Sequence, residues 1–213
     1  VVPGAVGAWR RAALDAVGGY PADTLAEDQD LTIAVQRAGW RVACDHEAIA
    51  WTEAPETVRA LFRQRYRWAF GTLQCLWKHS ALIFRGQPRG LAWFGLPQAW
   101  VFQIGLGLIS PMIDLALVAG LVDAGVRTYN HGWGVMSQDL ATMLAFWVAF
   151  SAIECGCGMV AYRLDGREGC LPVLRMLAMR FGYRQLLYAV VIHSVASAAH
   201  GLQVRWGAQQ RTG

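Results

Sequence analysis

Charged residues are distributed very unevenly along this chain. Apolar stretches of about 20 residues or more with hardly any charge are typical of helices that cross a membrane. Three such stretches follow residue 89, each with one charged residue: 90–122 with Asp114, 140–162 with Glu154 and 181–204 with Arg184. The sequence therefore predicts that 81–213 is a membrane region with two or three transmembrane helices plus interfacial helices.

Residues 1–80 contain frequent charges of both signs, as soluble sequence does. Over the whole chain 55% of residues are hydrophobic and 16% are charged, whereas about 25% are charged in soluble domains. This composition excludes a disordered chain, a disulfide-rich mini-protein and a coiled coil. The formal net charge of +4 is modest, so we expect no nucleic-acid partner.

Helix and strand signals alternate within 1–80. Helical spacing that ends at a glycine predicts helices over 10–17 and 28–38. Thr52, Pro55 and Glu56 mark the start of a third helix, which runs to about Lys78 and is interrupted only by Gly71. Short strands are predicted over 2–8, 40–44 and 48–51. This part of the chain is therefore expected to be an α/β segment.

The membrane region allows more than one topology. Pro97 and Pro111 are expected to break the stretch 91–122 into an interfacial helix and one span, or into two short spans. Arginines flank the apolar stretches, whereas the loop 123–139 carries a small negative charge. The positive-inside rule then places that loop outside the cell and favours one span. The stretch 180–200 is either a third span that lines a polar path or an interfacial helix.

The first cluster of candidate functional residues is Glu27, Asp28 and Asp30, at the predicted start of a helix. The free N–H groups and the dipole of a helix N-terminus stabilise carboxylates, and this alone is sufficient to explain Glu27 or Asp30. A carboxylate at such a junction also has the chemistry of a general base that takes a proton from a substrate hydroxyl.

The second cluster is Gln64, Arg67 and Trp68, which share one helix face because they are three and four residues apart. Gly71 continues that face and allows another segment to approach closely. Arginine binds phosphate through paired hydrogen bonds, and an indole offers a flat surface on which a sugar ring packs. The alternative interpretation is a basic helix that lies on anionic lipid.

Ala26-Glu27-Asp28 followed by Gln64-Arg65-Tyr66-Arg67-Trp68 resembles the paired E-D and Q-x-x-R-W signatures of the processive, membrane-embedded family 2 glycosyltransferases. This family includes the cellulose, chitin, hyaluronan and poly-N-acetylglucosamine synthases. The resemblance covers nearly the whole chain. Further matching segments are 4–11, 17–20, 38–42, 183–185 and 201–206, the last two resembling a branch in which some members carry a polysaccharide deacetylase upstream.

The resemblance implies a role for each motif residue. Asp28 is the expected general base, which deprotonates the acceptor hydroxyl before its in-line, inverting attack on a nucleotide sugar. Glu27 shapes the site beside it. Gln64, Arg67 and Trp68 hold the acceptor end and the diphosphate, and Arg67 stabilises the charge that develops on the leaving diphosphate.

The chain departs from the family pattern because the half of the catalytic domain that binds uridine and carries the metal-binding D-x-D is absent from it. Asp28-Gln29-Asp30 spells D-x-D, but it lies inside the E-D motif, so we assign no metal ligand here. Mg²⁺ or Mn²⁺ is expected to bind the missing half. His46 and His79 are expected to have surface or packing roles. Glu154 either lines a polymer channel or pairs with another helix.

The sequence therefore predicts the C-terminal half of a GT-A-like catalytic domain over 1–80, inactive by itself, followed by the membrane region 81–213. The expected donor is UDP-N-acetylglucosamine or UDP-glucose, and the expected acceptor is a growing β-linked polysaccharide that is moved across the bilayer. The expected location is the plasma membrane, with several spans and the catalytic segment in the cytoplasm. Two alternatives stay open: an inactive membrane scaffold, and a transferase that acts on a lipid-linked acceptor.

Overall fold

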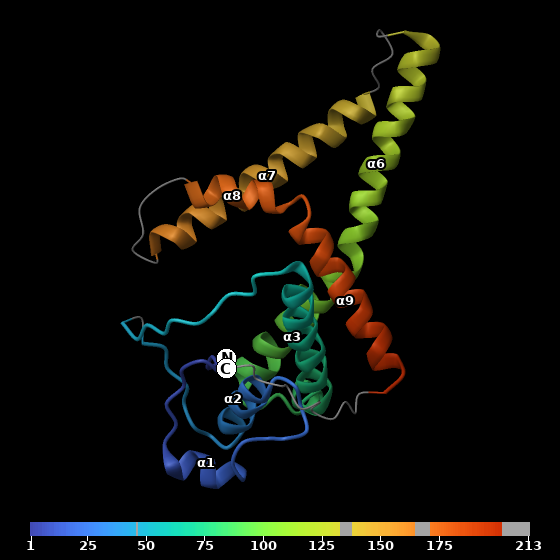
Figure 1. Ribbon diagram of the computed structural model, residues 1–213. Coiled ribbons are helices and arrows are strands. Elements are labelled where there is room, and N and C mark those ends of the chain that lie inside the picture. Colours follow the sequence, from blue (N-terminus) through green and yellow to red (C-terminus); the bar gives the residue numbers. More distant parts are fainter. Residues whose placement is uncertain (46, 133–137, 165–170, 202–213) are drawn as a thin grey trace. The chain divides into compact units, whose positions relative to one another are not determined.

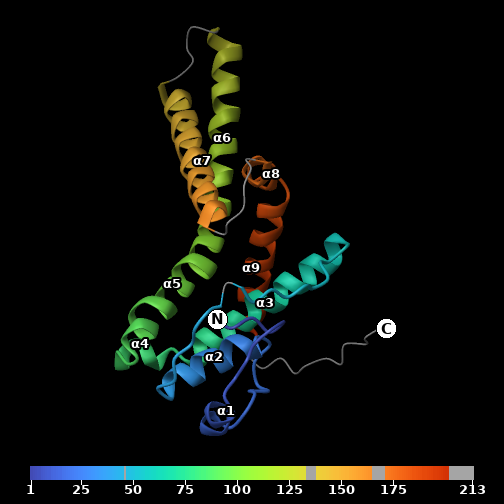
Figure 2. The same ribbon diagram turned by 90° about the vertical axis from the view of Figure 1, so that its left-hand side faces the viewer.

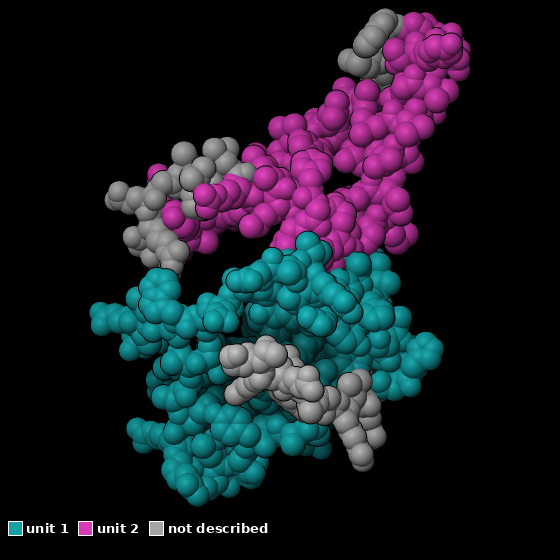
Figure 3. Space-filling view, viewed as in Figure 1, with its two compact units in different colours: residues 1–108, 189–213 teal, residues 109–188 magenta. Residues whose placement is uncertain are grey.

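The structure is a computed structural model that describes residues 1–45, 47–132, 138–164 and 171–201 (Figures 1 and 2). The chain divides into two compact units, one of residues 1–108 with 189–213 and one of residues 109–188 (Figure 3). His46, part of the predicted loop 123–139 and residues 202–206 of the matching C-terminal segment lie outside the described residues.

The first unit is built from helices joined by irregular segments. The helices within residues 1–80 agree with the sequence prediction to within a few residues. Gly18, in the left-handed conformation at φ 81°, ends the first of them, as predicted. The elements are α1 Arg11–Val17, α2 Glu27–Arg37, α3 Val58–Lys78, α4 Ala81–Arg85, η1 Leu91–Gly95, α5 Leu96–Gln98 and η2 Ala99–Gly105.

Helix α3 begins three residues later than the position expected from Pro55. Thr57 is the N-cap, and its hydroxyl oxygen accepts a hydrogen bond from the backbone N–H of Ala60 at 3.2 Å. This bond satisfies one of the free donors of the first turn, so the helix starts where a capping side chain is available.

The strands predicted over 2–8, 40–44 and 48–51 are absent, and the described residues contain no strand. A strand is stable only when neighbouring strands take up its backbone hydrogen bonds, and the described part of the chain supplies no such neighbour. Ile49 and Trp51 lie in an irregular segment and are 73% and 93% exposed. The α/β class expected for this segment is therefore not confirmed.

The core of the first unit lies where α2 meets α3, which run side by side (Figures 1 and 2). Ile33 from α2 and Leu73, Cys75 and Leu76 from α3 are buried in one cluster with the helical segment that follows. Gly71 allows the closest approach, because a Cβ at this position would lie 2.7 Å from the Ala26 nitrogen and 2.8 Å from the Ala26 Cβ. The close approach predicted at Gly71 is thus made by the segment that leads into α2.

Pro97 and Pro111 do not break the helix, contrary to the prediction. The chain stays helical through both, with π-helical turns at η1 and η2 on either side of Pro97 and with Pro111 inside α6, Leu106–His131. Proline lacks an N–H and its ring collides with the carbonyl four residues earlier, and wider turns relieve that collision. The helix also continues past residue 122 to His131, supported by an Arg127–Asp123 ion pair of 2.8 Å.

The second unit contains most of α6, then α7 Gln138–Leu164, α8 Leu171–Met179 and the first residues of α9 Tyr183–Ala199. Glycines allow its helices to approach. Met143 of α7 packs on Gly120 of α6, and Met176 of α8 packs on Gly158 of α7. Two helical stretches among the described residues, Leu91–His131 and Leu140–Leu164, are long and apolar enough to cross a membrane.

Glu154 pairs with Arg180, and the distance from Arg180 Nε to Glu154 Oε2 is 3.2 Å. Arg180 is only 8% exposed, donates a hydrogen bond to the Ser151 hydroxyl, and lies over the rings of Trp147 and Phe150. Of the two interpretations of Glu154, the structure favours pairing. A charge in an apolar helix is costly, and an opposite charge offsets part of that cost.

Helix α9 enters the first unit at Ala189. Val190 is 1% exposed and Ser194 is fully buried, while the His193 ring lies 5.0 Å from the Tyr66 ring of α3. The end of α9 thus packs against the helix that carries the second motif. The third span and the interfacial helix both stay predictions for 180–200.

Replacing Gly71 with alanine is expected to force α3 away from Ala26, because the new Cβ meets backbone there. We expect an overpacking cost of about 1–3 kcal/mol, seen as a lower melting temperature of the detergent-solubilised protein. The Cys75 thiol, which is 0% exposed, should then react faster with a maleimide, with the exposed Cys44 as internal reference. Gly125→Ala is the matched control, since nothing lies within 4 Å of its Cβ position. Equal protection of Cys75 in both variants contradicts the packing described.

Candidate functional site

Asp28 lies in the first turn of α2, and backbone groups hold its carboxylate. Oδ2 accepts a hydrogen bond from the Gly4 N–H at 2.9 Å, and Oδ1 accepts one from the Gln29 N–H at 2.7 Å. A Cβ on Gly4 would lie 3.2 Å from Oδ2, so the glycine leaves room for this contact. The side chain is half-buried. The fold therefore orients this carboxylate through backbone N–H groups, and it forms no ion pair with another described residue.

Glu27, the first residue of α2, is half-buried and makes no side-chain hydrogen bond or ion pair to another described residue. A carboxylate in the first turn interacts favourably with the helix dipole. This position agrees with both interpretations of Glu27, the helix-stabilising one and the site-shaping one.

Gln64, Arg67 and Trp68 lie on α3 as the spacing predicts. Gln64 and Arg67 are half-buried, and Trp68 is 47% exposed. Gly71 is on the same face one turn after Arg67, which corresponds to about 6 Å along the helix axis. The motif side chains thus lie next to the point where α3 touches the segment before Asp28.

Arg65 shapes the environment of Trp68. Its guanidinium carbon lies 4.3 Å from the centroid of the indole ring, a cation–π contact. One face of the indole is thus covered by a positive charge. A sugar ring that stacks on Trp68 must therefore use the opposite face.

Below the motif, α3 binds the segment that precedes α2. The Leu25 N–H donates to Gln74 Oε1 at 2.8 Å, and the Cys75 thiol lies 3.5 Å from the carbonyl oxygen of Ala26. The Thr72 hydroxyl donates to Gln29 Oε1 at 2.9 Å. Three side chains from about one turn of α3 therefore hold this helix against residues 25–29.

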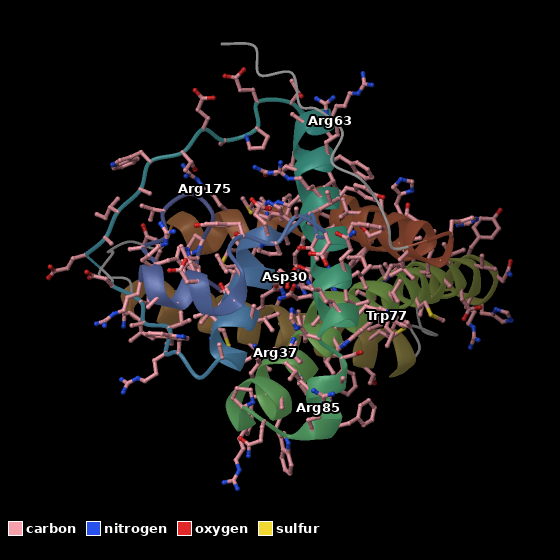
Figure 4. The ribbon with its side chains drawn as sticks, turned by 90° about the horizontal axis from the view of Figure 1, so that it is seen from below. Asp30, Arg37, Arg63, Trp77, Arg85 and Arg175 are labelled. Atoms are coloured by element: carbon pink, nitrogen blue, oxygen red, sulfur yellow. The ribbon has the colours of Figure 1, made fainter. Side chains whose placement is uncertain are left out.

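Asp30 is the most buried carboxylate of this region, with 1% of its surface exposed (Figure 4). Three side chains donate to its carboxylate: Thr24 at 3.0 Å, Lys78 at 2.8 Å and His79 at 2.7 Å. Lys78 also binds Asp23 at 2.8 Å. In Figure 4 Asp30 lies between α2 and α3, whereas Trp77 lies on the side of α3 that faces away from α2.

His79 is 2% exposed and uses both ring nitrogens. Arg37 lies 3.2 Å from Nδ1 and can only donate, so Nδ1 accepts. Nε2 therefore carries the hydrogen that is donated to Asp30, and the ring is neutral in this arrangement. The packing role expected for His79 is confirmed, and its hydrogen bonds give that role a specific partner.

Burial and hydrogen bonds together shift three pKa values here. Burial alone would raise the pKa of Asp30, but hydrogen bonds from His79 and Lys78 outweigh it and lower that pKa below 3.8. Burial would lower the pKa of Lys78, but hydrogen bonds to Asp23 and Asp30 raise it above 10.5. Burial raises the pKa of the Cys75 thiol to about 12, so this thiol stays protonated at neutral pH.

Sequence reasoning missed the network around Asp30. It gave Asp30 only a helix-dipole role, because its partners at residues 78 and 79 are too distant along the chain to share a motif spacing. The apolar run of α3 that ends in Lys78 and His79 was the available signal. This run indicates that two polar side chains, Lys78 and His79, follow a buried helix face. It does not indicate which residues they bind.

The described residues contain no cluster of three or more His, Cys, Asp or Glu side chains that would hold a metal ion. The two carboxylates of the D-x-D-like run bind different protein groups, backbone N–H for Asp28 and the Lys78–His79 pair for Asp30. A cavity of about 330 Å³ lies beside α2 with Gln29 and Gln36 in its wall. No predicted site residue lines it.

Comparisons with known proteins relate the chain to transferases. The family model described as "Glycosyl transferase family group 2" matches residues 1–154. A probable glycosyltransferase YdaM of Bacillus subtilis is 38% identical over 84 residues, which cover 39% of this chain and 20% of that protein.

One plant protein and one further bacterial protein are also similar to this chain. The probable glucomannan 4-beta-mannosyltransferase 7 of Oryza sativa subsp. japonica is 35% identical over 166 residues, 70% of this chain and 28% of that protein. The cellulose synthase catalytic subunit [UDP-forming] of Komagataeibacter sucrofermentans is 32% identical over 81 residues, 38% of this chain and 11% of that protein. The chain thus spans less than a third of each relative. No solved structure matches it.

The network around Asp30 predicts a pH window for stability. Since the pKa of Asp30 is lowered on folding, its contribution is present above pH 3.8 and is lost as the pH falls through the lowered value. Since the pKa of Lys78 is raised, its contribution is present below pH 10.5 and is lost as the pH rises through the raised value. At pH 7, Asp30→Asn should cost on the order of 2–3 kcal/mol.

The measurement is denaturant unfolding of the detergent-solubilised chain across this pH range. The difference between wild type and Asp30→Asn should be largest near neutral pH and shrink at both ends. Asp15→Asn is the control, because Asp15 pairs with Arg11 at an exposed position where little stability is expected. A constant difference from pH 3 to pH 11 contradicts the assigned network.

Proposed function

The chain belongs to glycosyl transferase family group 2, and from this membership we propose that it is part of an inverting transferase. We infer that the complete enzyme transfers a sugar from a nucleotide sugar to a growing β-linked glycan. One observation carries the proposal: Gly71 lets the helix with Gln64, Arg67 and Trp68 touch the segment that leads into Asp28. The two motifs are thereby brought to one place.

In the proposed reaction Asp28 accepts the proton of an acceptor hydroxyl. The hydroxyl oxygen then attacks the anomeric carbon in line, the bond from that carbon to the diphosphate breaks, and the configuration inverts. The diphosphate leaves with the electron pair, and Arg67 stabilises its charge through hydrogen bonds. The backbone bonds from Gly4 and Gln29 orient the Asp28 carboxylate for proton transfer.

The other motif residues are proposed to hold the substrates. Trp68 is proposed to pack against an acceptor sugar with the indole face that Arg65 leaves open. Gln64 is proposed to hydrogen bond sugar hydroxyls on the same helix face, and Glu27 to shape the site beside Asp28. These roles rest on the family motif and on the positions of the side chains.

The proposed donor is UDP-glucose or UDP-N-acetylglucosamine. A UDP donor is supported by a relative named as UDP-forming, and a β-linked product by relatives named as 4-beta-mannosyltransferases. The Q-x-x-R-W motif favours processive synthesis on a polysaccharide. A lipid-linked acceptor and an inactive scaffold remain the alternatives, and activity with a polysaccharide product distinguishes them.

Mg²⁺ or Mn²⁺ is proposed to bind a part of the enzyme that this chain does not contain, where it would help hold the diphosphate. The described residues do not fit a metal site, because Asp28 and Asp30 are engaged by protein donors in different directions. No step proposed here passes through the metal. We also propose that activity requires the donor-binding half of the domain.

The membrane region is proposed to make the enzyme a multi-pass protein of the plasma membrane, with the catalytic segment in the cytoplasm and the product moved outward. The two long apolar helices support this proposal. Their large side chains face outward, for example Leu115 at 68%, Phe146 at 72% and Ile153 at 65% exposure, which suits lipid better than water.

The catalytic assignment predicts that Asp28→Asn and Arg67→Ala abolish polymer synthesis by the full-length enzyme in membranes. Removing the base or the diphosphate partner should each reduce turnover by about 10²-fold or more. The measurement is incorporation of labelled sugar into polymer. Arg63→Ala is the matched control for Arg67, because Arg63 is an exposed arginine of the same helix (Figure 4). Normal synthesis by Asp28→Asn would remove Asp28 from the reaction.

The proposed topology predicts opposite labelling of two positions in intact cells. A cysteine in place of Tyr129, which is 91% exposed near the end of α6, should react with a membrane-impermeant maleimide from outside. The exposed Cys44 of the catalytic segment should react only after the membrane is permeabilised. Labelling of both residues from the same side overturns the proposed topology.

A further inference from the structure

Two carboxylates that are two residues apart have opposite environments. Asp28 is half-buried and accepts hydrogen bonds from backbone N–H groups, at 2.9 Å from Gly4 and 2.7 Å from Gln29. Asp30 is 1% exposed and accepts hydrogen bonds from three side chains. Two of those donors come from the end of α3. Asp28 therefore keeps the character of a reactive group, while Asp30 has that of a structural anchor.

The partners of Asp30 surround the start of α2. Thr24 reaches it from the segment before the helix, and Lys78 and His79 reach it from α3. Lys78 also binds Asp23, at 2.8 Å. Arg37, at the last residue of α2, lies 3.2 Å from His79 and completes the network. Both ends of α2 are thus tied to the same end of α3.

A second set of contacts lies further up α3. Gln74 accepts the Leu25 N–H at 2.8 Å, and Gly71 lies against Ala26. Contacts at two levels of one helix fix both the distance and the register of a segment packed along it, whereas one level alone leaves it free to pivot. The Asp28 carboxylate therefore has a defined position relative to Arg67, which is one turn above Gly71.

We propose that Asp30, together with Lys78 and His79, acts as a positioning residue of the transferase, an inference that rests on the function proposed above. The network holds the segment with the base Asp28 in register with the helix that carries Arg67. It keeps the proton acceptor and the group that stabilises the leaving diphosphate at a working separation. None of the three touches the reacting atoms.

The geometry argues against proton transfer by the network itself. Asp30 is saturated with donors, and both nitrogens of His79 are occupied, Nδ1 by Arg37 and Nε2 by Asp30. His79 is 2% exposed, so a substrate hydroxyl has no access to it. An amide can reproduce its two hydrogen bonds, because it has one acceptor and one donor group. His79→Gln should therefore preserve the network, and His79→Leu should break it.

The test measures turnover and substrate affinity of the full-length enzyme in membranes with UDP-sugar donors. Asp30→Asn, Lys78→Met and His79→Leu should each lower kcat by about 10- to 100-fold, since a displacement of about 1 Å at a reacting group has an effect of this size. The KM for the donor should change by less than about threefold, and UDP binding by calorimetry should be retained. His79→Gln should keep most of kcat and an unchanged pH profile.

Non-additivity provides the second readout. Because the residues act as one unit, the effects of their substitutions should not add. The kcat of the double variant, Asp30→Asn with Lys78→Met, should lie within about twofold of the kcat of the slower single variant. Asp15→Asn is the matched control, an aspartate in an exposed ion pair of 2.9 Å with Arg11 on α1, and it should leave kcat unchanged. If Asp30→Asn does not fold, as shown by loss of UDP binding, the partly exposed Lys78 provides the deciding variant.

The outcomes separate this inference from the proposed function. If Asp28→Asn is inactive but Asp30→Asn, Lys78→Met and His79→Leu keep wild-type kcat, the positioning role is wrong and the function stands. A loss of activity in His79→Gln equal to that in His79→Leu also overturns it, because it would give the imidazole a chemical role. If Asp28→Asn is fully active, the proposed function itself fails, whatever the other variants do.

Discussion

The buried carboxylate of Asp30 is the interaction on which the arrangement of the first unit depends. An ionised carboxylate that is 1% exposed is strongly unfavourable unless donors replace the lost water. Here Thr24, Lys78 and His79 supply that replacement, and they come from two segments separated by more than forty residues in the chain. Burial of this carboxylate is therefore tolerated only when α2 packs against the end of α3, because that packing brings Lys78 and His79 to Asp30.

This condition explains why α2 is stable where it is. The helix has eleven residues, and its N-cap Ala26 offers no side-chain hydrogen bond, so it would be marginal in isolation. Carboxylates in its first turn stabilise the helix through the helix dipole, but each contributes only about 0.3–1 kcal/mol to helix stability. Packing on α3 supplies the rest, through Ile33 in the shared core and through the close contact that Gly71 permits. The position of Asp28 follows from that packing and from the Gly4 N–H, not from helix propensity.

Sequence reasoning was strongest where the cause is local. Helical periodicity predicted α1, α2 and α3, and the common face of Gln64, Arg67 and Trp68, because these depend on neighbours three and four residues away. It was wrong where the outcome depends on distant partners. The strands expected at 40–44 and 48–51 need neighbouring strands, and Pro97 is tolerated because the turns around it widen. The Asp30 network, likewise, is made by residues with no fixed spacing. Two short motifs predicted a processive family 2 glycosyltransferase; the comparison confirmed family 2 over residues 1–154, and the processive branch stays a proposal.

The second motif has a structural extension that the letters Q-x-x-R-W do not include. On α3 the face of Gln64, Arg67 and Trp68 continues into Gly71, Cys75 and Lys78, which hold the segment of Asp28. The first half of this face carries the groups proposed to bind substrates, and the second half packs against protein. A helix is stiff over three turns, so a shift at Lys78 is carried to Arg67 with little attenuation. If the proposed roles hold, the two motifs act as one unit, because a single rigid helix carries Arg67 and also anchors the segment of Asp28.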